Sequence, residues 1–294
     1  MRSVRKFWLK NSAGELYSLN GEANVWSTSW AGLGYSASPS YADLNHGFYL
    51  AVSEDSEPQG NPTCTLVFTS NAPYADYTRF CNWLAAAVTL TLVYKPASEQ
   101  AYYRDIKVNF VQKGELNPVG WLEVPCSFLS TTQWYLPQPT ELALEAGGTD
   151  ESKRYDYEYT ETLIYGADSS AALSGSIHGA GHVPGSLLIR YYGAITNPKI
   201  RLTGDVSGKT FGICALTVVL AESDTLEIST RYEDSYARRI SASGAVTDLL
   251  DVLDITSTPF FHVPVDEPCT LSIEADAAFT GRADLLVYYY FRSV

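Results

Sequence analysis

Two histidines four residues apart form the most suggestive metal-binding pattern in this sequence. The segment is His178-Gly-Ala-Gly-His182. On a helix, this spacing would place both imidazoles on one face, where they could share a metal ion. Glycine disfavours a helix, however, and no carboxylate lies close enough in sequence to act as a third ligand. We therefore expect a glycine-rich loop at the junction of two strands, and no metal site.

Paired carboxylates are the second pattern that could do chemistry, because a glycoside hydrolase places two of them across a cleft. Asp156 with Glu158 and Glu233 with Asp234 are such pairs, but a solvated acidic surface has the same spacing. The sequence also contains no G-x-S-x-G elbow, phosphate-binding loop or dinucleotide-binding fingerprint. We therefore predict that the protein is not an enzyme and has no catalytic residues and no cofactor.

The formal net charge of −13 is unevenly divided along the chain. Residues 1–140 contain 9 Lys/Arg and 11 Asp/Glu, whereas residues 141–294 contain 11 Lys/Arg and 22 Asp/Glu. Because an acidic surface repels phosphate, we expect no direct binding to nucleic acid.

Cysteine usage and hydropathy indicate a soluble protein that is made in a reducing cytoplasm. The cysteines are odd in number and scattered singly, which suggests neither a disulfide framework nor a zinc site. We expect each of them to be a small buried apolar side chain. They are Cys64, Cys81, Cys126, Cys214 and Cys269. No stretch approaches the roughly 20 apolar residues of a transmembrane helix, so we expect no membrane insertion.

The first half of the chain alternates strand patterns around one helix. The helix is predicted to begin at Pro73 with Ser70 and Asn71 as capping residues. Apolar side chains then recur at spacings of three and four along one face: Tyr77, Phe80, Cys81, Leu84 and Val88. Strands are predicted at residues 5–10, 16–19, 90–94, 106–110 and 122–128.

The second half shows almost only strand patterns, separated by glycine and proline turns. Strands are predicted at residues 186–192, 198–203, 210–220, 225–231, 259–264, 269–275 and 283–291, with one short helix at 245–254. The fold class is therefore mainly β, with one short helix in the first domain. We expect a β-sandwich at residues 1–140, a linker at 141–154, and a second β-sandwich or jelly roll at 155–294.

Two aromatic stripes could form stacking platforms for a sugar or a partner protein. One is Tyr155, Tyr157 and Tyr159, and the other is Tyr288-Tyr-Tyr-Phe291. In a sandwich, alternate members of such stripes fill the core, and we favour this interpretation for both.

The order of elements in residues 1–140 resembles the N-terminal domain of siphophage distal tail proteins. No single piece is specific, but the ordered set is. It comprises the strand pair at Phe7-Trp-Leu and Leu16-Tyr-Ser-Leu19, Gly32-Leu-Gly34, Tyr77-x-x-Phe80-x-x-Trp83-Leu84, Leu90-x-Leu-x-Tyr94, Tyr102-Tyr-Arg-Asp-Ile-Lys-Val108, Lys113-Gly-Glu115 and Trp134-Tyr135.

The second half also resembles a part of these proteins, a galectin-like sandwich that often follows the first domain. The similar segment is Tyr192-Gly-Ala-Ile-Thr-Asn197-Pro-Lys-Ile200. It departs from the family pattern at Tyr192, where an asparagine is expected.

The resemblance implies a hexameric ring that joins the tail tube to the tip hub, with the second domain projecting outward. The implied partners are copies of this chain, the tail tube protein, a tail-tip hub or tail-associated protein, and a receptor-binding protein or host surface glycan. The implied location is the tail tip of the virion. Candidate interface residues, which could equally belong to the core, are Trp26, Trp30, Gly32, Leu33, Gly34 and Tyr35.

Two other functions remain open at this point. A sandwich with surface aromatic residues could be a glycan-binding module acting in host attachment. An all-β glycoside hydrolase is the third alternative, although no acid/base pair stands out.

Overall fold

The computed structural model divides the chain into two compact units. The first comprises Met1–Leu136 with Phe291–Val294, and the second comprises Pro137–Tyr290. The described residues are 5–22, 24–34, 40–43, 49–52, 60–96, 100–142, 173–254, 256–277, 279 and 281–294. The linker predicted at residues 141–154 therefore lies outside the described residues beyond Leu142.

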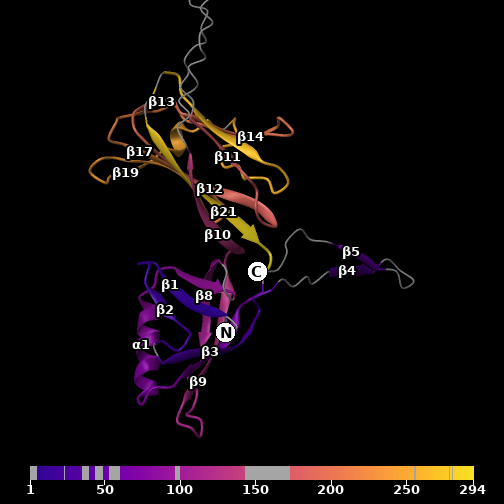
Figure 1. Ribbon diagram of the computed structural model, residues 1–294, viewed down its shortest axis with the longest axis vertical. Helices are drawn as coiled ribbons and strands as arrows, with labels where there is room; N and C mark the ends of the chain where they lie inside the picture. Colours follow the sequence, from indigo (N-terminus) through magenta and orange to yellow (C-terminus); the bar gives the residue numbers. More distant parts are fainter. Residues whose placement is uncertain are drawn as a thin grey trace, which may run out of the picture. The chain divides into compact units, whose positions relative to one another are not determined.

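The first unit is a β-sandwich flanked by one helix (Figure 1). Its elements are β1 (Lys6–Asn11), β2 (Leu16–Ser18), β3 (Val25–Ala31), β4 (Ser40–Asp43), β5 (Tyr49–Val52), β6 (Thr63–Phe68), α1 (Pro73–Ala85), β7 (Leu90–Lys95), β8 (Tyr102–Val111), β9 (Leu122–Ser130) and the start of β10 (Trp134–Leu142). The residues of β10 from Pro137 onward belong to the second unit. One layer has the order β2-β1-β7-β8, and β10 pairs with β8 at Tyr135. The other layer has the order β3-β6-β9-β8, so the long strand β8 belongs to both. Strands β4 and β5 pair with each other.

Strand alternation decides which side chains form the core of the first unit. Leu9 and Leu92 face inward from one layer, and Leu66 and Phe128 face inward from the other. All four are fully buried, and burying each contributes about 2 kcal/mol. The largest fully buried side chain is Trp134 at the start of β10.

Helix α1 begins at Pro73 as predicted but ends earlier than its apolar pattern suggested. Its N-cap residue is Ala72, whose N–H donates to the Ser70 hydroxyl, so the expected side-chain cap is absent. The helix ends at Ala85, and Val88 is 88% exposed instead of continuing the apolar face. Phe80 is the helix residue that enters the core, where its ring lies 6.0 Å from that of Phe68.

The second unit is also a two-layer sandwich. Its elements are β11 (Leu173–Ile177), β12 (Val183–Tyr192), β13 (Ile195–Thr196), β14 (Lys199–Gly204), β15 (Thr210–Ala215), β16 (Val219–Leu220), β17 (Thr225–Arg231), β18 (Asp234–Ile240), β19 (Val246–Asp248), a 3₁₀ turn (Leu250–Val252), β20 (Cys269–Glu274) and β21 (Arg282–Phe291). One layer has the order β19-β18-β17-β12-β21 and the other β11-β20-β14-β15. The mainly β prediction, with one α-helix in the first unit among the described residues, is confirmed.

Three predictions in the second unit were wrong in detail. Residues 245–254 form strand β19 and one 3₁₀ turn instead of a helix. The reason is that the Asp248 carboxylate accepts from the Leu250 N–H, and the Leu249 N–H donates to the Ala237 carbonyl of β18. Residues 259–264 make only a single bridge, between Val263 and Gly185, since prolines stand at both ends of the segment. The strand predicted at 210–220 is divided into β15 and β16.

The remaining patterns noted in the sequence are the histidine pair, the two aromatic stripes and the cysteines. Residues 178–182 connect β11 to β12 outside regular structure, as expected for the histidine pair. Tyr288, Tyr289 and Tyr290 are all buried, which agrees with the core interpretation, whereas the stripe at 155–159 lies outside the described residues. Four of the five cysteines are buried and Cys81 is partly buried.

Two kinds of feature are absent from the described residues. No group of three metal-ligating side chains occurs in that part of the chain. None of its helices has the length and apolar character needed to cross a membrane.

A row of alternating charges crosses the outer face of the five-stranded layer of the second unit. Cross-strand neighbours along the row, from β21 to β19, are Asp284, Arg190, Glu227, Arg238 and Asp248. Glu227 is only 1% exposed, and Arg190 Nε donates to its Oε2 at 2.5 Å. Arg238 and the Tyr236 hydroxyl donate to its Oε1. Burial raises the pKa of Glu227, but the donors from Arg190, Tyr236 and Arg238 outweigh it and lower the pKa below the ordinary value.

This lowered pKa predicts acid sensitivity of the second unit. The unfolded chain takes up a proton at the ordinary glutamate pKa of about 4.3, whereas the folded chain resists it. The stabilisation from Glu227 is therefore complete above that value and is lost as the pH falls through the lower folded pKa. Hydrogen exchange of β12, β17 and β18 between about pH 6 and pH 3 measures this loss, and Glu227→Gln should flatten it. An equally steep loss in Glu227→Gln would contradict the assignment.

Candidate assembly interface

The end of the β8–β9 hairpin has an unusual concentration of exposed apolar side chains. Within residues 108–129 they are Val108 (41% exposed), Phe110 (45%), Leu116 (44%), Val119 (70%), Trp121 (42%) and Leu129 (42%). We call these six side chains the hairpin patch. The loop that joins the two strands lies at the end of the first unit in Figure 1. Exposed apolar side chains concentrated in one hairpin are typical of a protein–protein contact.

A strand irregularity turns part of the hairpin patch outward. The pairing of β8 with β9 shifts between Val108 and Phe110, and Phe110 then lies opposite Ser127. Its side chain leaves the core as a result, although Cys126 and Phe128 beside Ser127 face inward and are buried. A β-bulge has this effect because one extra residue reverses the alternation of faces.

The loop of the hairpin is held in place by one asparagine. The Asn117 side-chain oxygen accepts from the N–H groups of Val119 and Trp121 at 3.1 and 3.0 Å, and its amide donates to Glu123 at 3.0 Å. Gly120 has a φ of 88°, which closes the turn. The apolar side chains of the tip are therefore presented on a pre-organised loop, which lowers the entropy cost of docking.

Charge on the hairpin is sparse and balanced. Its charged residues beyond Ile106 are Lys107, Lys113, Glu115 and Glu123. Two of them have partners within the unit, because Glu123 accepts from Asn117 and Lys113 Nζ lies 4.7 Å from the centre of the Tyr74 ring. Copies of this surface can approach each other with little net repulsion.

The two tryptophans predicted as interface residues lie on opposite faces of β3. Trp26 is opposite Val67 on the outer face and is 51% exposed. Trp30 stacks on the buried Phe7 with ring centres 4.2 Å apart. A bulge between Thr28 and Ala31, with Ser29 at a φ of 55°, reverses the alternation between them. Trp26 thus fits the interface alternative, and Trp30 fits the core alternative.

Gly32 and Leu33, two of the candidate interface residues, contribute to the sandwich itself. Gly32 has a φ of 70°, and a Cβ there would lie 2.0 Å from the backbone oxygen of Asn61. Leu33 packs against the core, and its carbonyl accepts from Trp134 Nε1 at 2.9 Å. Gly34 has open space around it, and Tyr35 lies outside the described residues. Leu33 and Trp134 belong to two of the segments that carry the resemblance described above. They therefore meet in the structure although they lie 101 residues apart in the sequence.

Arg104 is a buried organising residue that the sequence analysis did not single out. It is 0% exposed, and its guanidinium lies 5.0 Å from the centre of the Trp134 ring. It donates to the carbonyls of Thr132 and Gly60, both at 3.2 Å. Burial lowers the pKa of Arg104 to about 10. Period-two alternation from the buried Ile106 places Arg104 on the inner face, which is the signal that could have identified it.

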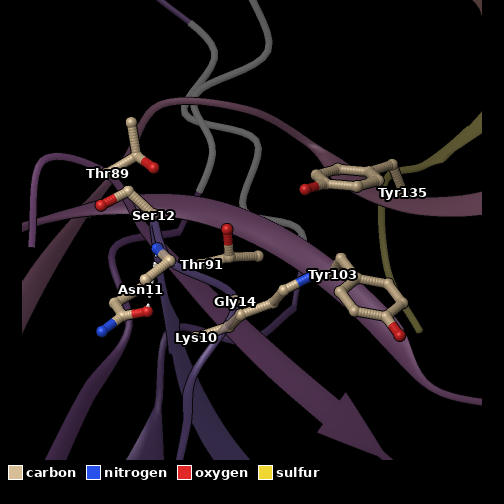
Figure 2. Close-up of a pocket in the computed structure, with 9 residues that line it drawn as sticks. Lys10, Asn11, Ser12, Gly14, Thr89, Thr91, Tyr103 and Tyr135 are labelled. Carbon is tan, nitrogen blue, oxygen red and sulfur yellow. Dashed lines mark hydrogen bonds between the residues drawn. The ribbon is translucent and has the colours of Figure 1, made fainter.

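A polar cavity of about 400 Å³ lies against strands β1, β7, β8 and β10 in the first unit (Figure 2). It is lined by Lys10, Asn11, Ser12, Ala13, Gly14, Thr89, Thr91, Tyr103 and Tyr135. The rings of Tyr103 and Tyr135 stack at 5.9 Å, and Asp105 accepts from Thr91 at 2.7 Å and from Tyr135 at 2.9 Å. Among these nine lining residues, only Lys10 belongs to a charged residue type. The lining can form hydrogen bonds to a partner, but it pairs no nucleophile with a base.

Comparison with known families decides what the first unit is. The family model for the distal tail protein N-terminal domain matches residues 6–131. The first unit carries this match, and we call it the distal tail domain. The resemblance to siphophage distal tail proteins predicted from the sequence is thereby confirmed, and with it a structural role in a phage tail. The hairpin patch, Gly32 and Arg104 all lie within the matched residues.

Solved structures show that the likeness of fold extends beyond the distal tail domain. A chain from the phage P2 baseplate in its activated conformation with Ca has a TM-score of 0.64 and 15% identity, covering 99% of this chain and 100% of that one. The same baseplate with Sr gives the same values. The SPP1 Dit protein, described as a paradigm of the hub adsorption apparatus in phages that infect Gram-positive hosts, has a TM-score of 0.58 and 11% identity. The alignment covers 96% of this chain and 98% of that one. The sequence matches no curated protein.

Proposed function

We propose that the chain forms a homo-hexameric ring that joins the tail tube to the tip hub. The observation that best supports this proposal is the hairpin patch on the distal tail domain. Six exposed apolar side chains, three of them on a pre-organised loop, are costly in water and stabilising at a contact between subunits. A closed ring needs two different surfaces on each copy. The hairpin patch supplies one, and we assign the other to a separate surface of the distal tail domain.

The charge distribution supports a division of labour between the two units. Residues 1–140 are nearly neutral, whereas residues 141–294 contain twice as many acidic as basic residues. A neutral domain can pack against copies of itself, and an acidic unit facing solvent keeps the assembly soluble. The second unit is therefore an outward accessory of the ring.

The partners of the ring follow from this placement. They are the tail tube protein on one side, a tail-tip hub or tail-associated protein on the other, and a receptor-binding protein reached through the second unit. The work of the chain is assembly at the virion tail tip after synthesis in the host cytoplasm. It needs no catalysis, cofactor, nucleic-acid contact or membrane insertion.

Salt dependence tests whether apolar contacts hold the ring together. We expect light scattering after size exclusion to give a mass six times 32.3 kDa. This mass should persist from about 0.05 to 1 M NaCl, because screening weakens charged contacts and leaves apolar ones intact. Dissociation at high salt would assign the contact to ion pairs elsewhere, and a monomer at every concentration would contradict the ring itself.

A further inference from the structure

We propose that the outer face of the five-stranded layer in the second unit binds a neutral saccharide. The site centres on Arg190 and Arg238, which flank Glu227 in the alternating row. It is independent of the proposed ring contact, which lies on the other unit.

The two arginines are held rigidly but are only partly used. Arg190 binds Glu227 through Nε alone, and within the described residues its terminal nitrogens make no hydrogen bond. Arg238 uses Nε and one terminal nitrogen on the same carboxylate, and its guanidinium lies 4.3 Å from the centre of the Tyr236 ring. The side chains of Arg190 and Arg238 are 48% and 37% exposed. Unused N–H donors therefore face solvent from fixed positions on two strands that flank β17.

The charge balance of this face selects the class of ligand. Glu227 neutralises one of the two arginine charges beside it, and Asp284 and Asp248 at the ends of the row bring the total to three negative and two positive charges. An anionic ligand would therefore meet net repulsion along this row, and the carboxylate between the two arginines is closed to a cationic ligand because the side chain of Glu227 is 2% exposed. Hydroxyl groups accept charge-assisted hydrogen bonds from arginine without adding charge.

An apolar row beside the charged row completes the match to a sugar ring. Leu286, Leu188, Ser229 and Tyr236 are cross-strand neighbours two residues further along the strands, at a separation of about 7 Å. The two leucines and Tyr236 are half-buried and face the same side as Arg190 and Arg238. A pyranose has hydroxyls on its rim and C–H groups on its face, so it can contact both rows together.

A binding assay on the full chain tests the proposal. The probes are neutral oligosaccharides built from hexoses and N-acetylhexosamines, with sulfated and phosphorylated oligosaccharides as the comparison, measured by saturation-transfer NMR. We expect binding of a neutral saccharide, and Arg190→Gln or Arg238→Gln should weaken it by about tenfold or more. Arg190→Lys should also weaken it, because lysine keeps the charge but loses the planar array of donors.

The matched control is Arg201→Gln on β14, in the other layer of the same unit. Its side chain is 35% exposed, similar to that of Arg238, so the substitution is comparable and binding should be unchanged. Thermal unfolding of each variant separates loss of the site from loss of the fold. The proposal is overturned if no neutral saccharide binds, if only anionic saccharides bind, or if folded Arg190→Gln and Arg238→Gln variants bind as tightly as the original chain.

Discussion

Replacing Phe110 by glutamate is expected to convert the proposed ring into monomers while the distal tail domain stays folded. Phe110 belongs to the hairpin patch and is 45% exposed, so a charged side chain is tolerated in the free chain. At a subunit contact the same charge would be desolvated without a partner, which costs several kcal/mol at each interface. We expect association to weaken by at least about 100-fold, roughly 3 kcal/mol. Sedimentation velocity across a dilution series measures the change.

Val88→Glu is the matched control for this experiment. Val88 is an exposed valine in the same domain, beyond the end of α1 and outside the hairpin patch. Its substitution adds the same charge and should leave the ring intact. If Phe110→Glu assembled as tightly as Val88→Glu, the hairpin patch would not be a ring contact.

Replacing Gly32 by alanine is expected to destabilise the distal tail domain severely. The φ of 70° costs a residue with a Cβ about 1–2 kcal/mol. The new Cβ would also lie 2.0 Å from the backbone oxygen of Asn61, and backbone cannot yield as a flexible side chain can. Together we expect a loss of roughly 3 kcal/mol or more in the free energy of unfolding.

Tryptophan fluorescence reads this result directly, because all six tryptophans of the chain belong to the first unit. Urea unfolding followed by this signal reports the distal tail domain without a contribution from the second unit. Gly34→Ala is the control, since that position has open space and no strained φ. Equal midpoints for the two variants would show that the turn at Gly32 adjusts without cost.

Much of the fold was predictable because strands reveal themselves by local alternation. Leu90, Leu92 and Tyr94 were expected to share a face, and all three are buried in β7. Element ends were less predictable. The α1 pattern suggested a helix to Val88, yet the helix ends at Ala85, because no local signal shows where the chain must turn into β7. Prolines at 259 and 264 were a usable warning against the strand predicted there.

The candidate interface was less predictable, because β-bulges determine which of its side chains face outward. The two-residue period places Trp26 and Trp30 on one face, and only the bulge at Ser29 separates them. A serine with a positive φ has no sequence signature. The same is true of the shift after Val108 that exposes Phe110. A helpful signal was present nearby, since the sequence of the β8–β9 loop is unusually apolar for a turn.

Negative-stain imaging of the purified chain tests the central claim most directly. In the proposed ring the hairpin patch of each copy is buried on the next copy, so we expect closed rings of six subunits with the second units around the outside. Uniform single particles with the mass of one chain, at micromolar concentration and with tail tube protein added, would contradict the account.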